Sequence, residues 1–341
     1  MSLLRDFWYV VAEGHELDRG QVLARQVLDE WLVVWRDAQG RPVVAQDRCM
    51  HRAGRLSHGR NVGGCVQCPY HGWTYDGAGE LVAVPAEGES FKKIGDRRLR
   101  TYASREQDGF VYVRLNDAPT LDVAPFRMPH YGEPGYQTVR VQNRMKNNVT
   151  NCVENFIDVP HTVYVHPGIF RTARGQRIEA TVVRSQGSVV ATYRNETDNL
   201  GWFARLLNPR AVKIEHSDAF YMPNVTHVVY RVGPRRHFLI TSQSVPISDD
   251  ETLVYTDLTF DFGPLSWFVR PIVRWQGQRV IDQDIVALGR QMEVIQKYGA
   301  EFHNSPVDVI HVLVESIRGE LSRGRDPREL PDRAKDIEFW V

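Results

Sequence analysis

Residues 49–79 read CMHRAGRLSHGRNVGGCVQCPYHGWTYDGAG and contain two pairs of metal-binding side chains. Cys49 and His51 form the first pair, Cys68 and His71 form the second, and 16 residues lie between the pairs. Two thiolates and two imidazoles make a four-ligand set that suits zinc or an iron–sulfur cluster. The glycines around both pairs allow a close backbone wrap, in which N–H groups are able to donate to inorganic sulfide. The stretch therefore predicts two loop tips that hold one metal group.

These two motifs resemble those of the Rieske domain of the Rieske non-haem iron oxygenases. The resemblance rests on CMHRAGRLSHG at 49–59 and on CPYHGWTYDGAG at 68–79. In a Rieske centre, two histidines replace two cysteines on one iron of a [2Fe–2S] cluster. The resemblance implies that Cys49 and Cys68 hold one iron, while His51 and His71 hold the other.

A structural zinc site is the competing interpretation of the same stretch. Cys65 and Cys68 form a C-x2-C pair, the commonest half of a zinc site. Zinc would normally require a second knuckle of similar shape, and it would leave one of five potential ligands unused. We therefore favour the Rieske cluster, with Cys65 outside it, and expect His58 to be a solvated loop residue.

The sequence around the motifs predicts an all-β domain. Short β-branched and aromatic runs alternate with Gly-rich turns, which is typical of a small barrel or sandwich; the runs are 7–11, 22–28, 31–35 and 110–115. Four prolines lie between Asp117 and Pro134 and indicate a linker. We expect a Rieske domain at residues 1–120 and a catalytic domain at 121–341.

Longer alternating runs in the second part predict strands of an antiparallel sheet; they are 178–193, 219–232, 237–245 and 252–262. Apolar residues from about 266 to 298 recur at three- and four-residue steps, which predicts a helix. The tail from Val307 is interpreted as a further amphipathic helix. The expected fold class is α+β, with the all-β domain followed by a large antiparallel sheet and covering helices, as in the helix-grip fold that the resemblance implies.

The composition limits the partners. Lys plus Arg equal Asp plus Glu, 42 against 42, so the chain has no field that favours nucleic acid or an anionic membrane. No apolar run approaches the length of a membrane span, and Arg5 and Asp6 interrupt the N-terminal region before a signal-peptide core forms. Four cysteines are too few for a disulfide framework. We expect a cytoplasmic protein.

A second dense motif, NCVENFIDVPHTVYVH, occupies residues 151–166. His161 and His166 are five residues apart, about 140° on an ideal helix, so the chain must bend or end between them for both to reach one metal. Pro160 is consistent with such a disturbance. Two histidines and a distant carboxylate make the facial triad of non-haem Fe(II) oxygenases. The alternative is a solvated loop of helix-capping residues.

The same stretch resembles the mononuclear-iron motif of the oxygenase family, D-x2-H-x4-H. The resemblance implies that His161 and His166 bind the iron. It also implies that Asp158 is not a ligand but the electron bridge from the metal histidine to a Rieske histidine of the neighbouring subunit. We expect Cys152 to be a buried small residue rather than a ligand.

The third ligand is expected on the helix at 266–298. At about 100° per residue, Asp284 falls within the arc of Ile281 and Leu288, whereas Asp282 and Glu293 fall toward the polar side. A carboxylate on an apolar stripe is costly unless a metal or a charged partner receives it. The family carboxylate sits in such a late helix, so we expect Asp284 to be the ligand, with Asp282 as the alternative.

Together the two motifs resemble the terminal oxygenase component of this family, of the type with a single α-subunit. The resemblance implies that the cluster passes electrons to mononuclear Fe(II), which uses O2 to hydroxylate an apolar ring-containing small molecule. Oxidative O- or N-demethylation and dihydroxylation run on the same iron. A Rieske protein that only transfers electrons is the alternative from another class, although it would not need the second motif.

The partners follow partly from the sequence and partly from the resemblance. The chain has no G-x-G-x-x-G fingerprint and no plant-type ferredoxin cysteine run, so a separate NAD(P)H-dependent reductase is expected, directly or through a ferredoxin. The resemblance implies a homotrimer. Basic residues near the first loop are either a docking site for an acidic redox partner or a solvated surface; they are Arg41, Arg48, Arg52, Arg55 and Arg60.

The substrate is only weakly indicated. If several aromatic and apolar side chains of the second domain face inward, the pocket suits an aromatic ligand, although most are expected to be core; they are Trp202, Phe203, Leu206, Leu207, Phe220, Tyr221, Met222, Tyr230, Phe238, Phe260 and Phe262. The remaining histidines match no motif and are expected to be structural or solvated; they are His15, His130, His216, His227, His237, His303 and His311.

Overall fold

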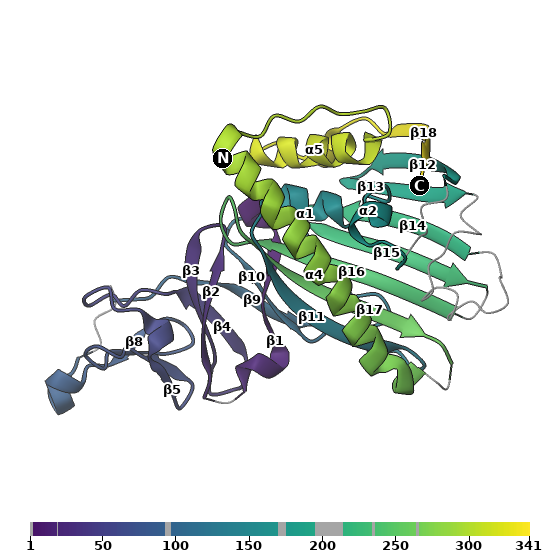
Figure 1. The fold of residues 1–341 in the computed structure, drawn as a ribbon. Helices are drawn as coiled ribbons and strands as arrows, with labels where there is room; N and C mark the ends of the chain where they lie inside the picture. The colour runs from purple at the N-terminus through teal and green to yellow at the C-terminus, as the bar shows by residue number, and fades with distance from the viewer. Residues whose placement is uncertain are drawn as a thin grey trace. The chain divides into compact units, whose positions relative to one another are not determined.

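The structure is a computed structural model that describes residues 3–18, 20–92, 97–169, 175–194, 214–233, 236–263 and 266–341. The chain divides into two compact units (Figure 1). One is Arg5–Arg127, and the other is Met128–Val341 together with Met1–Leu4.

The unit Arg5–Arg127 contains two antiparallel sheets, which confirms the all-β prediction. The first has the strand order β1-β10-β9-β4-β3-β2 and the second β5-β6-β7-β8. Their bounds are β1 Trp8–Glu13, β2 Val22–Val27, β3 Glu30–Arg36, β4 Pro42–Gln46, β5 Arg60–Val62, β6 Cys65–Gln67, β7 Thr74–Tyr75, β8 Leu81–Ala83, β9 Thr101–Gln107 and β10 Phe110–Arg114. Short 3-10 segments connect some of them, at η2 Gly14–Leu17, η3 Leu56–His58 and η4 Pro85–Ser90.

One tryptophan links the two sheets of this unit. Trp35 of β3 is fully buried, and its Nε1 donates to the carbonyl of Gly64 at 3.1 Å. Gly64 has φ +89°, and a Cβ there would lie 2.1 Å from the backbone nitrogen of Ala38. Only glycine fits this close approach, so the Gly63-Gly64 turn brings the β5–β8 sheet against β3.

The second unit is built on one antiparallel sheet of eight strands, in the order β11-β17-β16-β15-β14-β13-β12-β18. Helix α4 runs across the sheet over β11 and β17, and α5 lies beside β12 and β13 (Figure 1). The strands are β11 Gln137–Met145, β12 Arg177–Ser185, β13 Ser188–Arg194, β14 Ile214–Tyr221, β15 Val225–Val232, β16 Arg236–Pro246, β17 Thr252–Asp261 and β18 Arg333–Trp340. The helices are α1 Val149–Asn155, α2 Thr162–Val165, α4 Ser266–Tyr298 and α5 Val309–Ser322, with the 3-10 turn η5 Pro327–Glu329. The expected fold class is confirmed.

Three elements differ from the prediction. The runs 178–193 and 219–232 were interpreted as single strands, but each is a hairpin. The first turns at Gln186 and Gly187, which both have positive φ, and the second turns at the Met222–Pro223 peptide. Both turns carry signals in the sequence, Ser185-Gln186-Gly187-Ser188 in the first run and Pro223-Asn224 in the second, which the single-strand interpretation overlooked. The tail is helical only as far as Ser322 and then forms β18, which pairs with β12 along its length.

One face of the sheet carries ordered rows of side chains, because paired residues in neighbouring strands point the same way. Thr226, Ser242 and Thr256 form a row of hydroxyls across β15, β16 and β17. The next row holds Val228, Ile240 and Leu258, and beyond it Tyr230 lies beside Phe238. This face and helix α4 enclose the candidate site.

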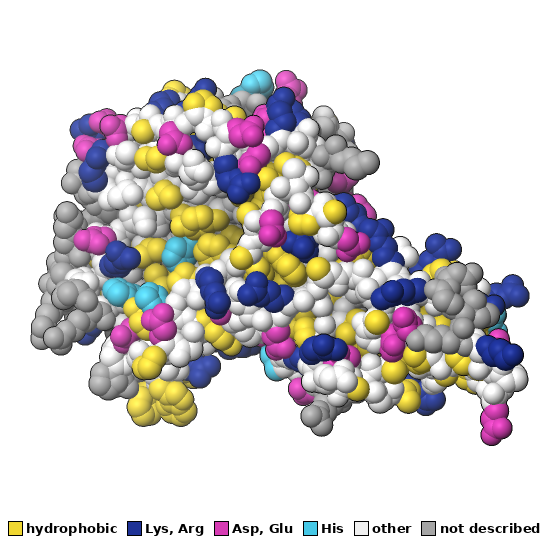
Figure 2. Space-filling model, turned by 180° about the vertical axis from the view of Figure 1, so that it is seen from behind, with side chains coloured by type: hydrophobic (Ala, Val, Ile, Leu, Met, Phe, Trp, Pro, Cys, Tyr) yellow, Lys and Arg dark blue, Asp and Glu magenta, His cyan; other side chains and the backbone are white. Residues whose placement is uncertain are grey.

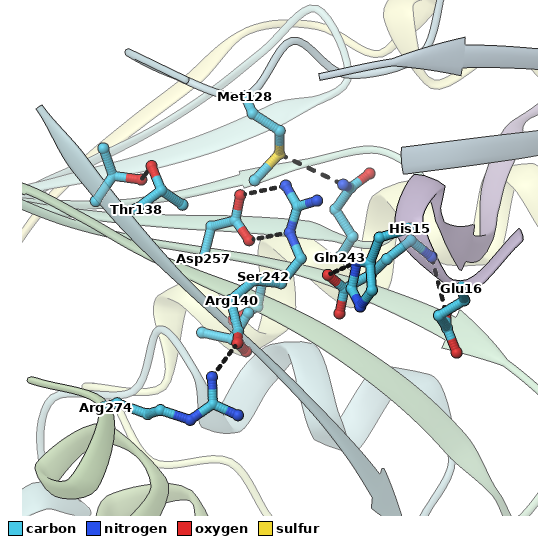
Figure 3. A network of polar contacts seen from close by, with 12 residues as sticks. His15, Glu16, Met128, Thr138, Arg140, Ser242, Gln243, Asp257 and Arg274 are labelled. Carbon is cyan, nitrogen blue, oxygen red and sulfur yellow. Dashed lines mark hydrogen bonds and ion pairs between the residues drawn. The ribbon is translucent and has the colours of Figure 1, made fainter. Parts of the chain in front are cut away.

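The opposite face of the sheet carries a buried ion pair, shown in Figure 3. Arg140 of β11 donates to both carboxylate oxygens of Asp257 on β17, at 2.6 and 2.7 Å. Arg274 of α4 donates to the backbone carbonyl of Arg140 at 3.4 Å. The bidentate pair fixes the register of β11 on β17, and the Arg274 bond adds a link between β11 and the helix.

In the described part of the chain, no helix has the length and hydropathy that a bilayer span requires.

Candidate metal centres

Three side chains converge between α2 and α4. His161, His166 and Asp284 each offer one ligand atom, and these atoms all lie within 4.8 Å of one another. The Nε2 atoms of His166 and His161 lie 3.1 and 3.7 Å from the same oxygen, Oδ1 of Asp284. His166 and Asp284 are almost fully buried.

The local chain path explains how two histidines five residues apart reach one point. Helix α1 ends at Asn155, and α2 is a single turn with His161 as its N-cap and His166 as its C-cap. The histidines therefore flank a short turn instead of sharing one regular helix. Their rings lie 5.2 Å apart at 76° to each other. The bend expected between them is confirmed.

Hydrogen bonds place the protons on the outer nitrogens of both rings. His161 Nδ1 contacts the backbone carbonyl of Asp158, which can only accept, so this nitrogen carries the proton. His166 Nδ1 lies 2.9 Å from Oε1 of Gln283 and donates to it. Both Nε2 lone pairs consequently face Asp284, the arrangement that a metal-binding histidine needs.

This donor set fits a cation. Oδ1 of Asp284 is buried and has no hydrogen-bond partner among the described residues, although two imidazole nitrogens surround it. Burial alone would lower the pKa of His161, but the Asp158 and Asp284 carboxylates raise it. The site thus favours positive charge at the point where three electron-rich atoms meet. Two imidazoles and one carboxylate are the ligands that Fe(II) takes in a facial triad.

Asp158 lies beside the triad and is held by a histidine that sequence reasoning missed. Nε2 of His311, on α5, is 3.9 Å from Asp158, and its Nδ1 is 3.3 Å from Glu154. Burial would lower the pKa of His311, but these two carboxylates raise it to about 10. Burial likewise would raise the pKa of Asp158, but His161 and His311 hold it well below its usual range. His311 was expected to be structural or solvated, and no spacing in the sequence joins it to Asp158.

The other acidic residues of α4 lie away from this point. Asp282 is exposed and accepts a hydrogen bond from Gln278 at 2.8 Å, and Glu293 is exposed. Asp284 is 3% exposed. The buried position of Asp284 and the exposed positions of Asp282 and Glu293 agree with their expected places on the helix.

The other four predicted ligands gather at the tips of two loops in the unit Arg5–Arg127. The first loop closes through Cys49 N and Gly54 O at 2.9 Å, and the second through Cys68 N and Trp73 O at 2.8 Å. Both cysteines are buried. The rings of His51 and His71 lie 4.6 Å apart.

The contacts of this loop pair fit a [2Fe–2S] cluster. A Cβ on Gly54 would lie 3.2 Å from Cys68 Sγ, so glycine leaves the sulfur accessible. The hydroxyl of Tyr75 lies 3.3 Å from Cys49 Sγ and is a donor for a thiolate. His51 Nδ1 is buried without a hydrogen-bond partner among the described residues. Burial raises the pKa of the Cys68 thiol, and a coordinated metal is what keeps such a sulfur deprotonated.

Cys65 is half-buried on β6, and Cys152 is fully buried in the other unit, as expected of a small core residue. Burial raises the pKa of Cys152 to about 12. Three of the five basic residues near the first loop bind acceptors of their own unit: Arg41 binds Asp37, Arg55 binds Asp47 and Arg60 binds Gln67.

A cavity of about 110 Å³ adjoins His161, His166 and Asp284. Its walls are the rows of the sheet described above and the face of α4 that carries Gln276, Val280 and Asp284. Apolar side chains and histidines gather on one face of the molecule (Figure 2). Of the aromatic residues named from the sequence, Tyr230 and Phe238 line the cavity, while Phe220 and Phe260 are core. Trp202, Phe203, Leu206 and Leu207 lie outside the described residues.

A buried polar group in the cavity wall was also missed. His216 lies between the rings of Tyr193 and Tyr230, and its Nε2 is 2.9 Å from Asp218. The hydroxyl of Tyr193 donates to the same carboxylate at 2.8 Å. The alternating pattern of β14 places His216 and Asp218 on one face, but it does not show that this face borders a cavity.

Comparison with known families matches both halves of the chain. Residues 7–103 match the Rieske [2Fe-2S] domain, and residues 145–316 match the vanillate O-demethylase oxygenase C-terminal domain. A Rieske domain binds a [2Fe–2S] cluster, and the oxygenase components of this family use a mononuclear iron in the catalytic domain.

Several curated proteins are similar over part of their length. The oxygenase component of dicamba O-demethylase from Stenotrophomonas maltophilia is 32% identical over 56% of this chain and 56% of its own length. The iron-sulfur subunit of the toluene-4-sulfonate monooxygenase system from Comamonas testosteroni is 28% identical over 53% and 52%. The chain thus spans about half the length of these relatives.

Solved structures share the fold over nearly the whole chain. Dicamba monooxygenase bound to dicamba superposes with a TM-score of 0.80 at 24% identity, covering 95% of this chain and 98% of that one. NdmA from Pseudomonas putida CBB5 with caffeine superposes with a TM-score of 0.81 at 21% identity, covering 98% and 97%.

Proposed function

Because the chain belongs to the Rieske non-haem iron oxygenases, with a catalytic domain of the vanillate O-demethylase type, we propose that it is the terminal oxygenase of a multicomponent system. It hydroxylates an apolar, ring-containing small molecule with O2 and with electrons from a separate reductase. The observation that carries the proposal is the convergence of His161, His166 and Asp284 beside a largely apolar cavity.

The proposal assigns a role to each residue of the two centres. Cys49, Cys68, His51 and His71 hold the [2Fe–2S] cluster; His161, His166 and Asp284 hold Fe(II). When bound, these groups supply single electrons and the activation of O2. Asp158 orients His161, whose Nδ1 proton is held by the Asp158 carbonyl, and is the bridge toward a Rieske histidine of a neighbouring subunit. Gln283 orients His166 in the same way.

The surrounding side chains bind and orient the substrate. The row of Val228, Ile240 and Leu258 excludes water from one side of the cavity and offers a surface for a ring. Helix α4 closes the cavity opposite this row and contributes the carboxylate ligand. A ring held between sheet and helix therefore presents an edge or a substituent to the three ligands.

Oxidative demethylation is the second candidate, and the similarity to the dicamba O-demethylase component favours it. Hydroxylation of an O- or N-methyl group and hydroxylation of a ring carbon use the same donor set. Which reaction occurs depends on the group that the cavity places next to Asp284.

The partners follow from the same reasoning. The electrons come from an NAD(P)H-dependent reductase, directly or through a ferredoxin, and the working form is a homotrimer of the 39.2 kDa chain. We place the protein in the cytoplasm, where its four free cysteines stay reduced. Light scattering at low concentration tests the trimer; a monomer would contradict it.

The variant His161→Ala tests the function. It is expected to keep the spectrum of the cluster, to lose about one of three irons per chain, and to form no oxidised product from a ring-containing test substrate with a surrogate reductase. His303→Ala, at an exposed position, is the control and should match the wild type. Substantial product from His161→Ala would exclude the assigned iron site.

A further inference from the structure

The side-chain N–H group of Gln276, on α4, is buried at the wall of the cavity. The residue is 4% exposed and lines the cavity. Its Nε2 group is buried and has no hydrogen-bond partner among the described residues. A buried N–H group without an acceptor costs free energy, and a ligand in the adjoining cavity is able to supply that acceptor.

The position of Gln276 relative to the metal ligands suits a substrate contact. It precedes Asp284 by eight residues on the same helix, which is about 12 Å along the axis and about 80° around it. Val280 lies between them and lines the cavity with them. A ring that carries two opposite substituents fits this separation, with one substituent at Gln276 and the other at the iron ligands.

The cavity between these two ends is apolar on one side. Val228, Ile240 and Leu258 form the row that faces α4, and Phe238 follows in the next row. At Gly277, adjacent to Gln276, the side chain of Leu258 packs directly against the helix backbone, because a Cβ there would lie 2.3 Å from Cδ1 of Leu258. This shape favours a flat ring between the amide and the ligands.

The charges of the wall distinguish neutral from anionic ligands. Among the described lining residues, the charged side chains are three carboxylates, namely Asp158, Asp218 and Asp284, beside three histidines. Asp158 is paired with His311, Asp218 with His216 and Tyr193, and Asp284 lies among the proposed metal ligands, while no lysine or arginine is among the described lining residues. A buried anionic substituent at the Gln276 end would therefore have no cationic side chain to pair with, whereas a neutral carbonyl oxygen accepts a hydrogen bond without adding charge.

We propose that Gln276 determines the substrate class: its Nε2 donates to a neutral carbonyl-type oxygen of the ring-bearing substrate, so the cavity selects uncharged carbonyl compounds over aryl carboxylates. This inference rests on the proposed function, because it uses the same cavity. It makes Gln276 a specificity-determining residue that touches the substrate at the end far from the reacting group.

Three probes that differ in one substituent test the proposal. 4-Methoxybenzamide has a neutral acceptor, 4-methoxytoluene has none, and 4-methoxybenzoate has an anionic one. Calorimetric titration of the reduced, anaerobic holoenzyme is expected to show the amide binding about tenfold tighter than the other two. In Gln276→Leu the amide should lose this advantage, while 4-methoxytoluene binds as well as before or better.

The control is Gln296→Leu, at an exposed glutamine of the same helix. This variant should bind the three probes in the same order of affinity as the wild type. The proposal fails if Gln276→Leu binds the amide as tightly as the wild type, if the benzoate binds at least as well as the amide, or if no probe binds. Iron content measured on the same sample separates the two claims. If the protein is fully loaded with iron but binds the probes in a different order of affinity, only the proposed substrate class is contradicted. If the protein lacks the mononuclear iron, the proposed function is contradicted.

Discussion

Substitution of Asp284 tests the proposed metal site directly. Its Oδ1 faces two imidazole nitrogens and has no hydrogen-bond donor among the described residues. Asp284→Asn is expected to lose about one iron per chain and more than about 100-fold in activity, because the amide is a poor ligand. Asp282→Asn, two residues away and exposed, should keep both. Metal analysis of the two variants side by side decides between the carboxylates, and iron loss in Asp282→Asn alone would reverse the assignment.

His227 predicts a pH dependence of stability that is independent of the metals. Burial lowers its pKa to about 4, and its Nδ1 lies 2.9 Å from the Thr241 hydroxyl. The unfolded chain, with a histidine pKa of about 6.5, binds the proton more readily. Stability is therefore complete above about pH 7 and is lost as the pH falls from about 6.5 to 4, by at most about 3 kcal/mol.

The variant His227→Gln retains a hydrogen-bonding group but does not titrate. Urea unfolding at pH 7.5 and pH 5 is expected to show a smaller loss of stability for the variant than for the wild type. Equal losses would mean that His227 is not held neutral in the folded protein.

The candidate metal ligands were easier to predict from the sequence than the residues that contact those ligands or line the cavity. The Cys/His pairs and the two histidines stand out in the sequence, because metal binding restricts both the type of the ligand residues and their spacing. Gln276, Gln283 and His311 carry no such restriction. They reach the site only because α4 and α5 pack beside α1 and α2 (Figure 1), which periodicity does not encode.

Helix α4 packs closely on strand β17 at one glycine. A Cβ on Gly277 would lie 2.3 Å from Cδ1 of Leu258, whereas a Cβ on Gly289 of the same helix meets nothing within 4 Å. Gly277→Ala is expected to destabilise the protein by about 1–2 kcal/mol, because the helix or the leucine must shift. Gly289→Ala should stabilise it by about 0.5–1 kcal/mol through helix propensity alone.

Thermal or urea unfolding of the two variants checks this difference. Adding Leu258→Val to Gly277→Ala should recover part of the loss, because the shorter side chain frees the space. Two variants of equal stability would show that α4 does not lie this close to β17.

The long helix of the second unit was predicted correctly, whereas two hairpins and the last strand were not. The helix at 266–298 has the bounds of α4, since its apolar stripe has no competing pattern. The hairpins at 178–193 and 219–232 were missed because the turn signals inside them, Gln186-Gly187 and Pro223-Asn224, were not weighed against the β-branched residues on either side. Strand β18 was missed because its polar, exposed residues pair with β12 at the edge of the sheet and not with a core.

The two candidate metal centres lie in two different compact units of the chain. The unit that contains the β5–β8 sheet carries the two loop tips with the four predicted cluster ligands. In the other unit, the eight-stranded sheet and α4 form the walls of the cavity. The order of the units along the chain was predictable from composition and motifs. The cavity was not, because it depends on which face of the sheet α4 covers.

The most direct test of the central claim is an EPR spectrum of anaerobically purified, dithionite-reduced protein, with iron measured on the same sample. A protein that holds a Rieske cluster and a mononuclear iron is expected to give a rhombic signal with an average g value below that of the free electron, and about three irons per chain. An EPR-silent, colourless protein that holds one zinc per chain would contradict it.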